Sequence, residues 1–217
     1  MVHFSLITHH SMLHPRDKSA ATTVGMVRVA RTFSNVVSPP VMFAVLGLAL
    51  ALRELAFWPG LLWAAVYGFF VSLAPILFIL LMLRAGHISD LHISVRQQRH
   101  LPYLVSIGCA AVALLLLRLL NGPELLRCLV LFNIAELVAL GVINVYWQIS
   151  IHATAVMATT LIAGLVFGLQ ISLLLSPFVI LVAWARHYLR RHTAAQILAG
   201  LGLGALSALA LNLTGCF

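Results

Sequence analysis

Charge is scarce in this sequence of 217 residues. Charged residues make up 8% of it, five residues are acidic, and the mean hydropathy is +1.07. A soluble domain of this length needs far more charge to cover its surface, so the scarcity excludes a soluble globular protein. Hydrophobic residues instead make up 62% of the chain, and uncharged runs recur at the length of about 20 residues that crosses a bilayer core. We therefore expect an integral membrane protein.

Cysteine is rare as well. The three cysteines, Cys109, Cys128 and Cys216, are each embedded in apolar sequence. Their spacings match neither the disulfide framework of a small secreted domain nor a zinc site. We therefore expect all three to act as small hydrophobic side chains.

The sequence lacks the short alternating strands of about ten residues that build an outer-membrane barrel. Its apolar runs are long and continuous, which predicts an all-α, polytopic transmembrane bundle. Turn signals separate the runs at FWPG (57–60), at NGPE (121–124) and, more weakly, near Gln170. Because the last signal is weak, the prediction is six or seven spans. The seven candidate spans are 41–57, 61–83, 103–119, 125–146, 153–169, 171–185 and 195–213.

The first 36 residues lack the apolar core of a cleavable signal peptide. They carry several charged side chains, among them Arg16, Lys18 and Arg31. We expect residues 1–36 to form a polar tail followed by an interfacial helix. The remaining residues, 37–217, then form one transmembrane domain.

Polar residues gather on one side of the predicted bundle. With seven spans, the segments 84–102, 146–152 and 185–192 leave the membrane at the same face, because an even number of crossings separates each from the next. Arginine forks match phosphate oxygens with bidentate, charge-assisted hydrogen bonds, so the arginines in these segments predict an anion site. The polar side chains that the three segments supply are Arg96, Arg99, Ser150, His152, Arg186 and His192.

Two histidines in an anion site indicate chemistry as well as binding. A neutral imidazole can attack phosphorus, and a second, protonated imidazole can donate a proton to the leaving oxygen. Histidine titrates near neutrality without special tuning. This scheme needs no metal and no cofactor, and of the five acidic residues only Asp90 lies near the cluster in the sequence.

Three short runs in these segments form recognisable patterns. Residues 185–196 read alanine, arginine, five residues, histidine, three residues, glutamine, and continue into the apolar run ILAGLGLG. Residues 149–152 read ISIH. Residues 90–102 contain Arg96 and Arg99 ahead of a proline.

In order and separation, these runs resemble the three motifs of the type 2 phosphatidic acid phosphatase superfamily of membrane lipid phosphatases. The resemblance covers residues 90–200 and is closest to a bacterial branch with ISxH and HTxxQ variants. It implies a phosphatase-like domain at 37–217 in a bacterial inner (cytoplasmic) membrane. It implies His192 as the nucleophile that forms a phosphohistidine, His152 as the general acid, and Gln196 as the residue that orients His192. The phosphate-binding residues that it implies are Arg186, Ser150, and Arg96 or Arg99.

The chain departs from the family where Gln196 replaces an aspartate, because an amide cannot stabilise an imidazolium by charge. The leading interpretation is a phosphatase acting on a lipid phosphate or prenyl diphosphate in the bilayer, with no nucleic-acid partner. The alternative is a catalytically impaired lipid-phosphate binding or scaffold protein of the same fold. Small residues at 200–210 permit tight helix packing, either within one chain or in a homo-oligomer. Buried Glu136, with Asn133 and Asn144, forms either a structural clamp or part of the pocket floor.

Charge and resemblance point to opposite orientations of the chain. Family members that dephosphorylate envelope lipids usually act on the outer face. Ten of the thirteen lysines and arginines lie on the motif side, which places the motifs in the cytoplasm by the positive-inside rule. A cytoplasmic site favours isoprenoid diphosphates or phosphatidate-like lipids made on that face. The ten residues are Arg16, Lys18, Arg28, Arg31, Arg84, Arg96, Arg99, Arg186, Arg190 and Arg191.

Overall fold

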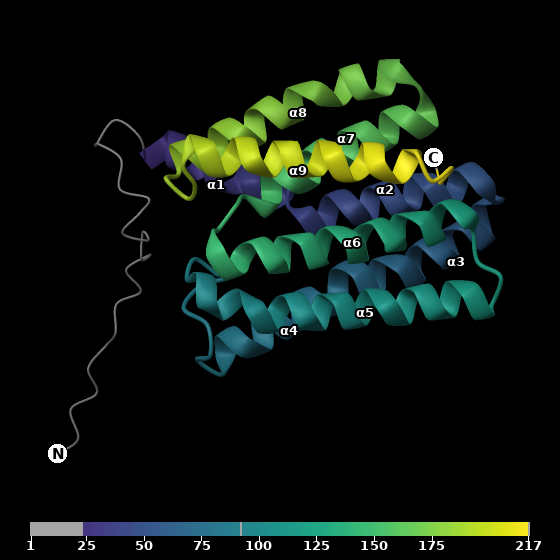
Figure 1. Cartoon of the computed structure of the whole chain (residues 1–217), viewed down its shortest axis with the longest axis horizontal. Helices are drawn as coiled ribbons and strands as arrows, with labels where there is room; N and C mark the ends of the chain where they lie inside the picture. The colour runs from purple at the N-terminus through teal and green to yellow at the C-terminus, as the bar shows by residue number, and fades with distance from the viewer. Residues whose placement is uncertain (1–23, 92, 217) are drawn as a thin grey trace.

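The structure is a computed structural model that describes residues 24–91 and 93–216. Its described part is all-α, without a strand (Figure 1). A π-helical turn at Phe69–Leu73 joins α3 to α4, and a 3₁₀ turn at Arg96–Arg99 precedes α5. The described residues begin at residue 24, so the predicted polar tail lies outside them. The helices are α1 (Val24–Val36), α2 (Pro39–Glu54), α3 (Phe57–Gly68), α4 (Ala74–Arg84), α5 (His100–Leu119), α6 (Glu124–Tyr146), α7 (Ile151–Phe167), α8 (Leu169–Tyr188) and α9 (Ala194–Asn212).

The predicted transmembrane bundle is confirmed. Five helical segments are long and apolar enough to cross a membrane, and α1 with α2, bent by 43°, makes up to six. Helix α7 is apolar but only 17 residues long, and it packs between α8, α9 and α2 in the same bundle (Figure 1). Every predicted span coincides with a helical segment to within four residues at each end.

The breaks between the helices have clear local causes. Gly168 ends α7 with φ +102°, a conformation that residues with a Cβ rarely adopt, so the predicted break near Gln170 falls two residues earlier. The FWPG signal does not mark a loop, because Phe57 already begins α3 and Pro59 lies in its first turn. Proline is tolerated there, since the N–H groups of a first helical turn have no partner within the helix.

Helices α7 and α9 approach each other closely at two glycines of α9. A Cβ atom at Gly200 would lie 2.6 Å from the carbonyl oxygen of Ser150, and one at Gly204 would collide with the carbonyl of Thr154. The small residues at the start of the 200–210 stretch therefore pack within one chain. This contact sets the start of α7 beside the start of α9.

Helix α1 packs on the last turns of α8. Its buried residues Val27 and Ala30 form a small apolar cluster with Ala185 and Leu189. Residues 24–36 of the predicted N-terminal segment form α1, which lies at the end of the bundle where α8 finishes (Figure 1).

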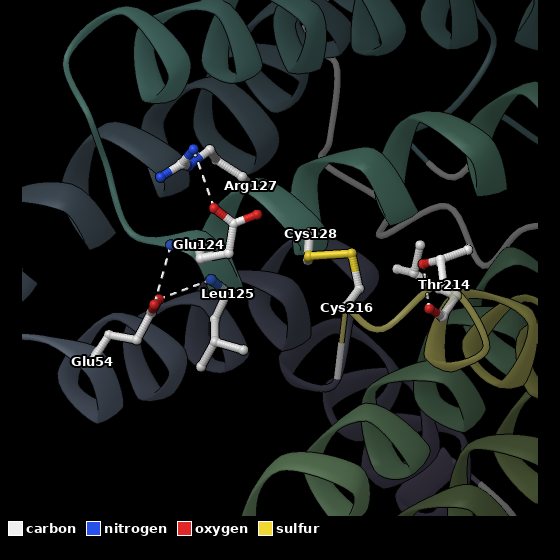
Figure 2. Close-up of a disulfide and its surroundings, with 8 residues drawn as sticks. Glu54, Glu124, Leu125, Arg127, Cys128, Thr214 and Cys216 are labelled. Atoms are coloured by element: carbon white, nitrogen blue, oxygen red, sulfur yellow. Dashed lines mark hydrogen bonds and ion pairs between the residues drawn. A yellow bond between two sulfur atoms is a disulfide. The ribbon is translucent and has the colours of Figure 1, made fainter.

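The opposite end of the bundle is held together by charged and covalent links (Figure 2). The Glu54 carboxylate, at the end of α2, accepts the N–H groups of Glu124 and Leu125 at 3.1 and 2.8 Å. A carboxylate is stabilised at this position because the N-terminus of α6 carries a partial positive charge. Cys128 of α6 forms a disulfide with Cys216, which follows α9.

The disulfide corrects the prediction that all three cysteines act as small hydrophobic side chains. The two cysteines are 88 residues apart in sequence, and no short spacing motif marks such a pair. They meet because α6 begins, and α9 ends, at the same end of the bundle (Figure 1). The third cysteine, Cys109, is free and half-buried.

Candidate functional site

The three polar segments predicted to share one membrane face do lie at one end of the bundle (Figure 1). The segment between α4 and α5, the link from α6 to α7 and the link from α8 to α9 all connect helices there. The backbone N–H of Ser150, at the start of α7, donates to the carbonyl of Gln196 in α9 at 3.1 Å. The ISIH and RHTAAQ runs are therefore in direct contact.

His192 lies between α8 and α9, just before Thr193 caps α9. The residue is 5% exposed. The pKa of His192 is lowered to about 3, first by burial and then by the positive charges of Arg186, Arg99 and Arg191, against a smaller opposite effect of the hydrogen bond with Gln196. The imidazole is therefore neutral at physiological pH, and its Nδ1 has no hydrogen-bond partner among the described residues.

Arg186 projects from the last turn of α8 into the same region. It is 2% exposed, and its Nη1 donates to the Ser34 hydroxyl of α1 at 3.1 Å. A guanidinium this deeply buried is retained only where acceptors or an anion compensate its lost hydration. Ser34, itself buried, is a site neighbour that the sequence interpretation missed.

The structure separates the roles of the two arginines of the first run. Arg96 donates to the carbonyl groups of Asn144 and Val145, the last turn of α6, and the Asn144 amide donates back to the Arg96 carbonyl at 3.1 Å. Its side chain thus caps a helix end.

Arg99, by contrast, is buried and acts electrostatically on His192. Its Nε donates to the carbonyl of Ile93 at 2.8 Å. With the Gln148 amide placed so that its oxygen faces the guanidinium, that oxygen accepts from Arg99 Nη2 at 2.7 Å. Arg99 is therefore the first-run arginine that the structure brings to the histidine.

Ser150 and His152 occupy the start of α7. Ser150 is fully buried and is the N-cap, since its hydroxyl accepts the N–H of Ala153 at 3.4 Å. His152, two residues later, is buried in the first turn. The positive end of the α7 dipole lies there, and such helix starts favour anions.

Gln196 has a structural task that the sequence interpretation did not consider. Thr193 and Gln196 form a capping box: the Gln196 side-chain oxygen accepts the Thr193 N–H at 3.0 Å, and the Thr193 hydroxyl accepts the Gln196 N–H at 3.3 Å. Threonine followed by glutamine three residues later is the sequence signature of this motif. Gln196 therefore fixes the start of α9 and also interacts with the His192 imidazole.

Arg191 is a further candidate site residue, which the sequence analysis counted only among the charges that set the orientation. Its side chain is 11% exposed, its Nη1 donates to the Ser94 hydroxyl at 2.8 Å, and it lies 3.9 Å from the Asp90 carboxylate. It also acts on His192 electrostatically. The adjacent pair Arg190 and Arg191 was the available signal, but the sequence did not show that only Arg191 turns inward.

Two open cavities of about 480 and 550 Å³ flank this cluster and share Gln148 and Gln196 as lining residues. The smaller is lined by His187, Arg191 and His192, among others. The larger is lined by residues of the segment between α4 and α5 and by residues 146–148 at the end of α6. Ser150, His152 and Arg186 are buried and line neither cavity.

Of the three buried polar residues of α6, Asn133 and Asn144 have structural roles, and the role of Glu136 is not defined by its contacts. The Asn144 amide donates to the Arg96 carbonyl, and the Asn133 side-chain oxygen accepts a hydrogen bond from the Tyr67 hydroxyl at 2.7 Å. Both residues therefore link segments that are distant in sequence. Glu136 is buried, and its Oε1 has no hydrogen-bond partner in the described residues. None of the three lines either cavity.

The arrangement can hold an oxyanion and present a neutral imidazole to it. Among the described residues, no group of three or more histidine, cysteine or acidic side chains could hold a metal ion. The side chains that the cluster offers are imidazole and guanidinium groups. Comparison with protein-family models, with curated proteins and with solved structures finds no match to this chain.

Proposed function

We propose that this protein is a bacterial inner-membrane phosphatase that hydrolyses a lipid phosphate or prenyl diphosphate through a phosphohistidine, as the resemblance to type 2 phosphatidic acid phosphatases implies. The observation that carries the proposal is the placement of His192. A buried, neutral imidazole lies at a cavity edge, and three guanidinium groups act on it. Such an excess of positive charge in a buried place favours binding of a phosphate dianion.

The first step forms a bond between a His192 nitrogen and phosphorus, while the bond from phosphorus to the bridging oxygen of the lipid breaks. His152, protonated, donates its proton to that leaving oxygen. Arg186, Arg99 and Arg191 neutralise charge on the equatorial oxygens of the phosphoryl group as it transfers. The lipid alcohol, or the lipid monophosphate from a diphosphate, is released.

The second step uses the now neutral His152 as a base. It takes a proton from water as the water oxygen attacks phosphorus, and the bond from His192 nitrogen to phosphorus breaks. Orthophosphate leaves, and both imidazoles return to their starting states. His192 needs to be unprotonated only when it attacks, and its burial keeps it so.

One observation favours the alternative function, a lipid-phosphate binding or scaffold protein. Gln196 has its oxygen engaged by the Thr193 N–H and carries no charge. Its support of an imidazolium is therefore weaker than that of a carboxylate. An impaired site would still bind the anion through the same arginines without turning it over.

The test is phosphate release by the purified full chain in detergent, with chelator present, from farnesyl diphosphate and from phosphatidate. We expect His192→Ala to lower the release rate by about a thousandfold or more, because the nucleophile is lost. His187→Ala is the matched control, since His187 lines the same cavity and is exposed. Its rate should stay within about threefold of the wild type.

A phosphohistidine is labile to acid and stable to base, so labelled phosphate trapped during turnover identifies the intermediate. Label that is lost in acid and absent from His192→Ala supports the proposal. Anion binding without release, by a folded protein, would favour the binding or scaffold function instead.

A further inference from the structure

The two ends of the bundle differ in covalent chemistry. The end opposite His192 carries the disulfide between Cys128 and Cys216 (Figure 2). The free cysteine, Cys109, lies within α5. The covalent link therefore marks one end of the molecule.

A disulfide that persists indicates the compartment in which it forms. Thiol pairs stay reduced in the bacterial cytosol, whereas the periplasm keeps them oxidised. Formation proceeds by exchange with the disulfide of a periplasmic thiol oxidoreductase: the two thiols of the chain lose two electrons and two protons, and the oxidoreductase disulfide becomes two thiols. The end with the disulfide therefore belongs on the periplasmic side.

Charge gives an independent indication. Eight of the eleven described arginines lie at the His192 end, and three, Arg53, Arg118 and Arg127, lie at the disulfide end. Each of these three is at or next to a short turn, and two glutamates, Glu54 and Glu124, offset them. Positive charge in short membrane-flanking segments marks the cytoplasmic side.

Exposed aromatic side chains show where the bundle meets the two membrane surfaces. Trp58 is 75% exposed at the disulfide end, and Tyr146 is 83% exposed at the His192 end. Tryptophan and tyrosine favour the interface between lipid and water. The two ends thus lie at opposite surfaces, so the sides assigned by the disulfide and by charge apply to the whole chain.

We infer that the disulfide end faces the periplasm and that the His192 cluster opens on the cytoplasmic side of the membrane. The orientation rests on the disulfide and the arginines, and the naming of the two sides rests on the bacterial inner membrane of the proposed function. Its consequence for substrate rests on the proposed function: the site takes phosphorylated lipids whose headgroups lie in the cytoplasmic leaflet. Lipids with headgroups in the outer leaflet are then out of reach.

The orientation is tested by labelling the full chain in intact cells of a Gram-negative bacterium. Ala56→Cys and Ala85→Cys form a matched pair, because both alanines are exposed at helix ends and lie at opposite ends of the bundle. Each is made with Cys109→Ala, so that the new thiol is free while the native disulfide stays intact. A membrane-impermeant maleimide should modify Ala56→Cys in intact cells and Ala85→Cys only after the cells are opened. The reverse pattern would overturn the inference.

The disulfide is tested by counting free thiols in the wild-type chain after acid quenching. One free thiol is expected in cells with a working periplasmic thiol oxidase, and three in cells that lack it. Three free thiols in both strains would remove the disulfide argument and overturn the assignment based on it.

The substrate consequence is tested with farnesyl diphosphate added outside sealed membrane vesicles. Inside-out vesicles should release phosphate, and right-side-out vesicles should not. Release only from right-side-out vesicles would overturn the orientation while the proposed function stands. Release from neither kind, with the expected labelling, would overturn the proposed function and leave the orientation supported.

Discussion

His192 is buried beside three guanidinium groups, so a proton on its imidazole is strongly disfavoured. The same packing that keeps the nucleophile neutral makes the folded state sensitive to acid. In the unfolded chain the imidazole takes up a proton near its ordinary pKa of about 6.5. Folding must then expel that proton whenever the pH is below this value.

We therefore expect acid to destabilise the wild type more than His192→Asn. Between pH 6.5 and about 3 the unfolded chain binds a proton at this position that the folded chain does not, so stability falls as pH falls. The contribution of this residue approaches about 1.4 kcal/mol per pH unit. Melting temperatures in detergent at pH 7.5 and 4.5, in buffer free of phosphate and sulfate, measure it. Equal losses in both proteins would show that His192 binds the proton when folded.

Arg99 and Arg96 are expected to respond differently to lysine. Arg99→Lys keeps the charge but loses the guanidinium group that bonds both the Ile93 carbonyl and the Gln148 side chain. We expect kcat/KM for farnesyl diphosphate to fall by about tenfold to a hundredfold. Arg96→Lys weakens the cap of α6, so it should lower the melting temperature and leave kcat/KM within about threefold. A larger loss of kcat/KM in Arg96→Lys would reverse the assignment.

Single-residue roles were only partly predictable. Residue type and spacing predicted one cluster of Arg186, His152 and His192; the structure places Arg186 beside His192 and His152 buried in the first turn of α7. Residue type and spacing could not show which of Arg96 and Arg99 faces the site. Both lie in one short 3₁₀ turn, and only the direction of that turn decides which one is buried. The capping box of Gln196 was readable from the sequence but competed with the motif resemblance.

At the level of helices, the crossing of α7 and α9 sets the geometry of the site. Gly200 lies against the carbonyl of Ser150, two residues from His152. The start of α9 follows His192 directly. A substitution that pushes α7 and α9 apart should therefore also move His152 away from His192.

Gly200→Ala should destabilise the fold and reduce activity, because the added Cβ would lie 2.6 Å from the Ser150 carbonyl oxygen. We expect a loss of about 1 to 3 kcal/mol, the usual cost of overpacking. Gly202→Ala is the matched control on the same helix, since nothing lies within 4 Å of its Cβ position. It should match or slightly exceed the wild-type melting temperature, since alanine favours helix over glycine. Equal losses in both variants would show that the close approach of Gly200 to the Ser150 carbonyl is not the cause of the destabilisation.

Helix existence followed from the sequence because each apolar run is long and uninterrupted. Boundaries were set by finer features, such as the positive φ of Gly168 and the tolerance of Pro59 in a first helical turn. The π-helical turn within the span 57–84 left no sequence signal. Composition determines that a segment is a helix, but single residues determine where it starts and bends.

For the whole molecule, counting membrane crossings was enough to predict that three distant segments meet. The same count also brings the start of α6 and the end of α9 together, where the disulfide lies. The pair was missed because spacing motifs describe cysteines that are close in sequence, whereas the membrane brings together residues that are 88 positions apart. Topology was therefore the more informative guide to the cysteines.

Removing the disulfide should lower stability and spare the chemistry, because the bond lies at the end opposite His192. Closing a loop of 88 residues restricts the unfolded chain, and the loss of such a bond costs about 2 to 5 kcal/mol. We expect Cys128→Ala with Cys216→Ala to melt at a clearly lower temperature in detergent, as the wild type should after reduction. Cys109→Ala, which removes the free half-buried thiol, should melt within a few degrees of the wild type. At low temperature the double variant should keep its rate of phosphate release. A loss of that rate would show that the disulfide positions the histidines from the opposite end of the bundle.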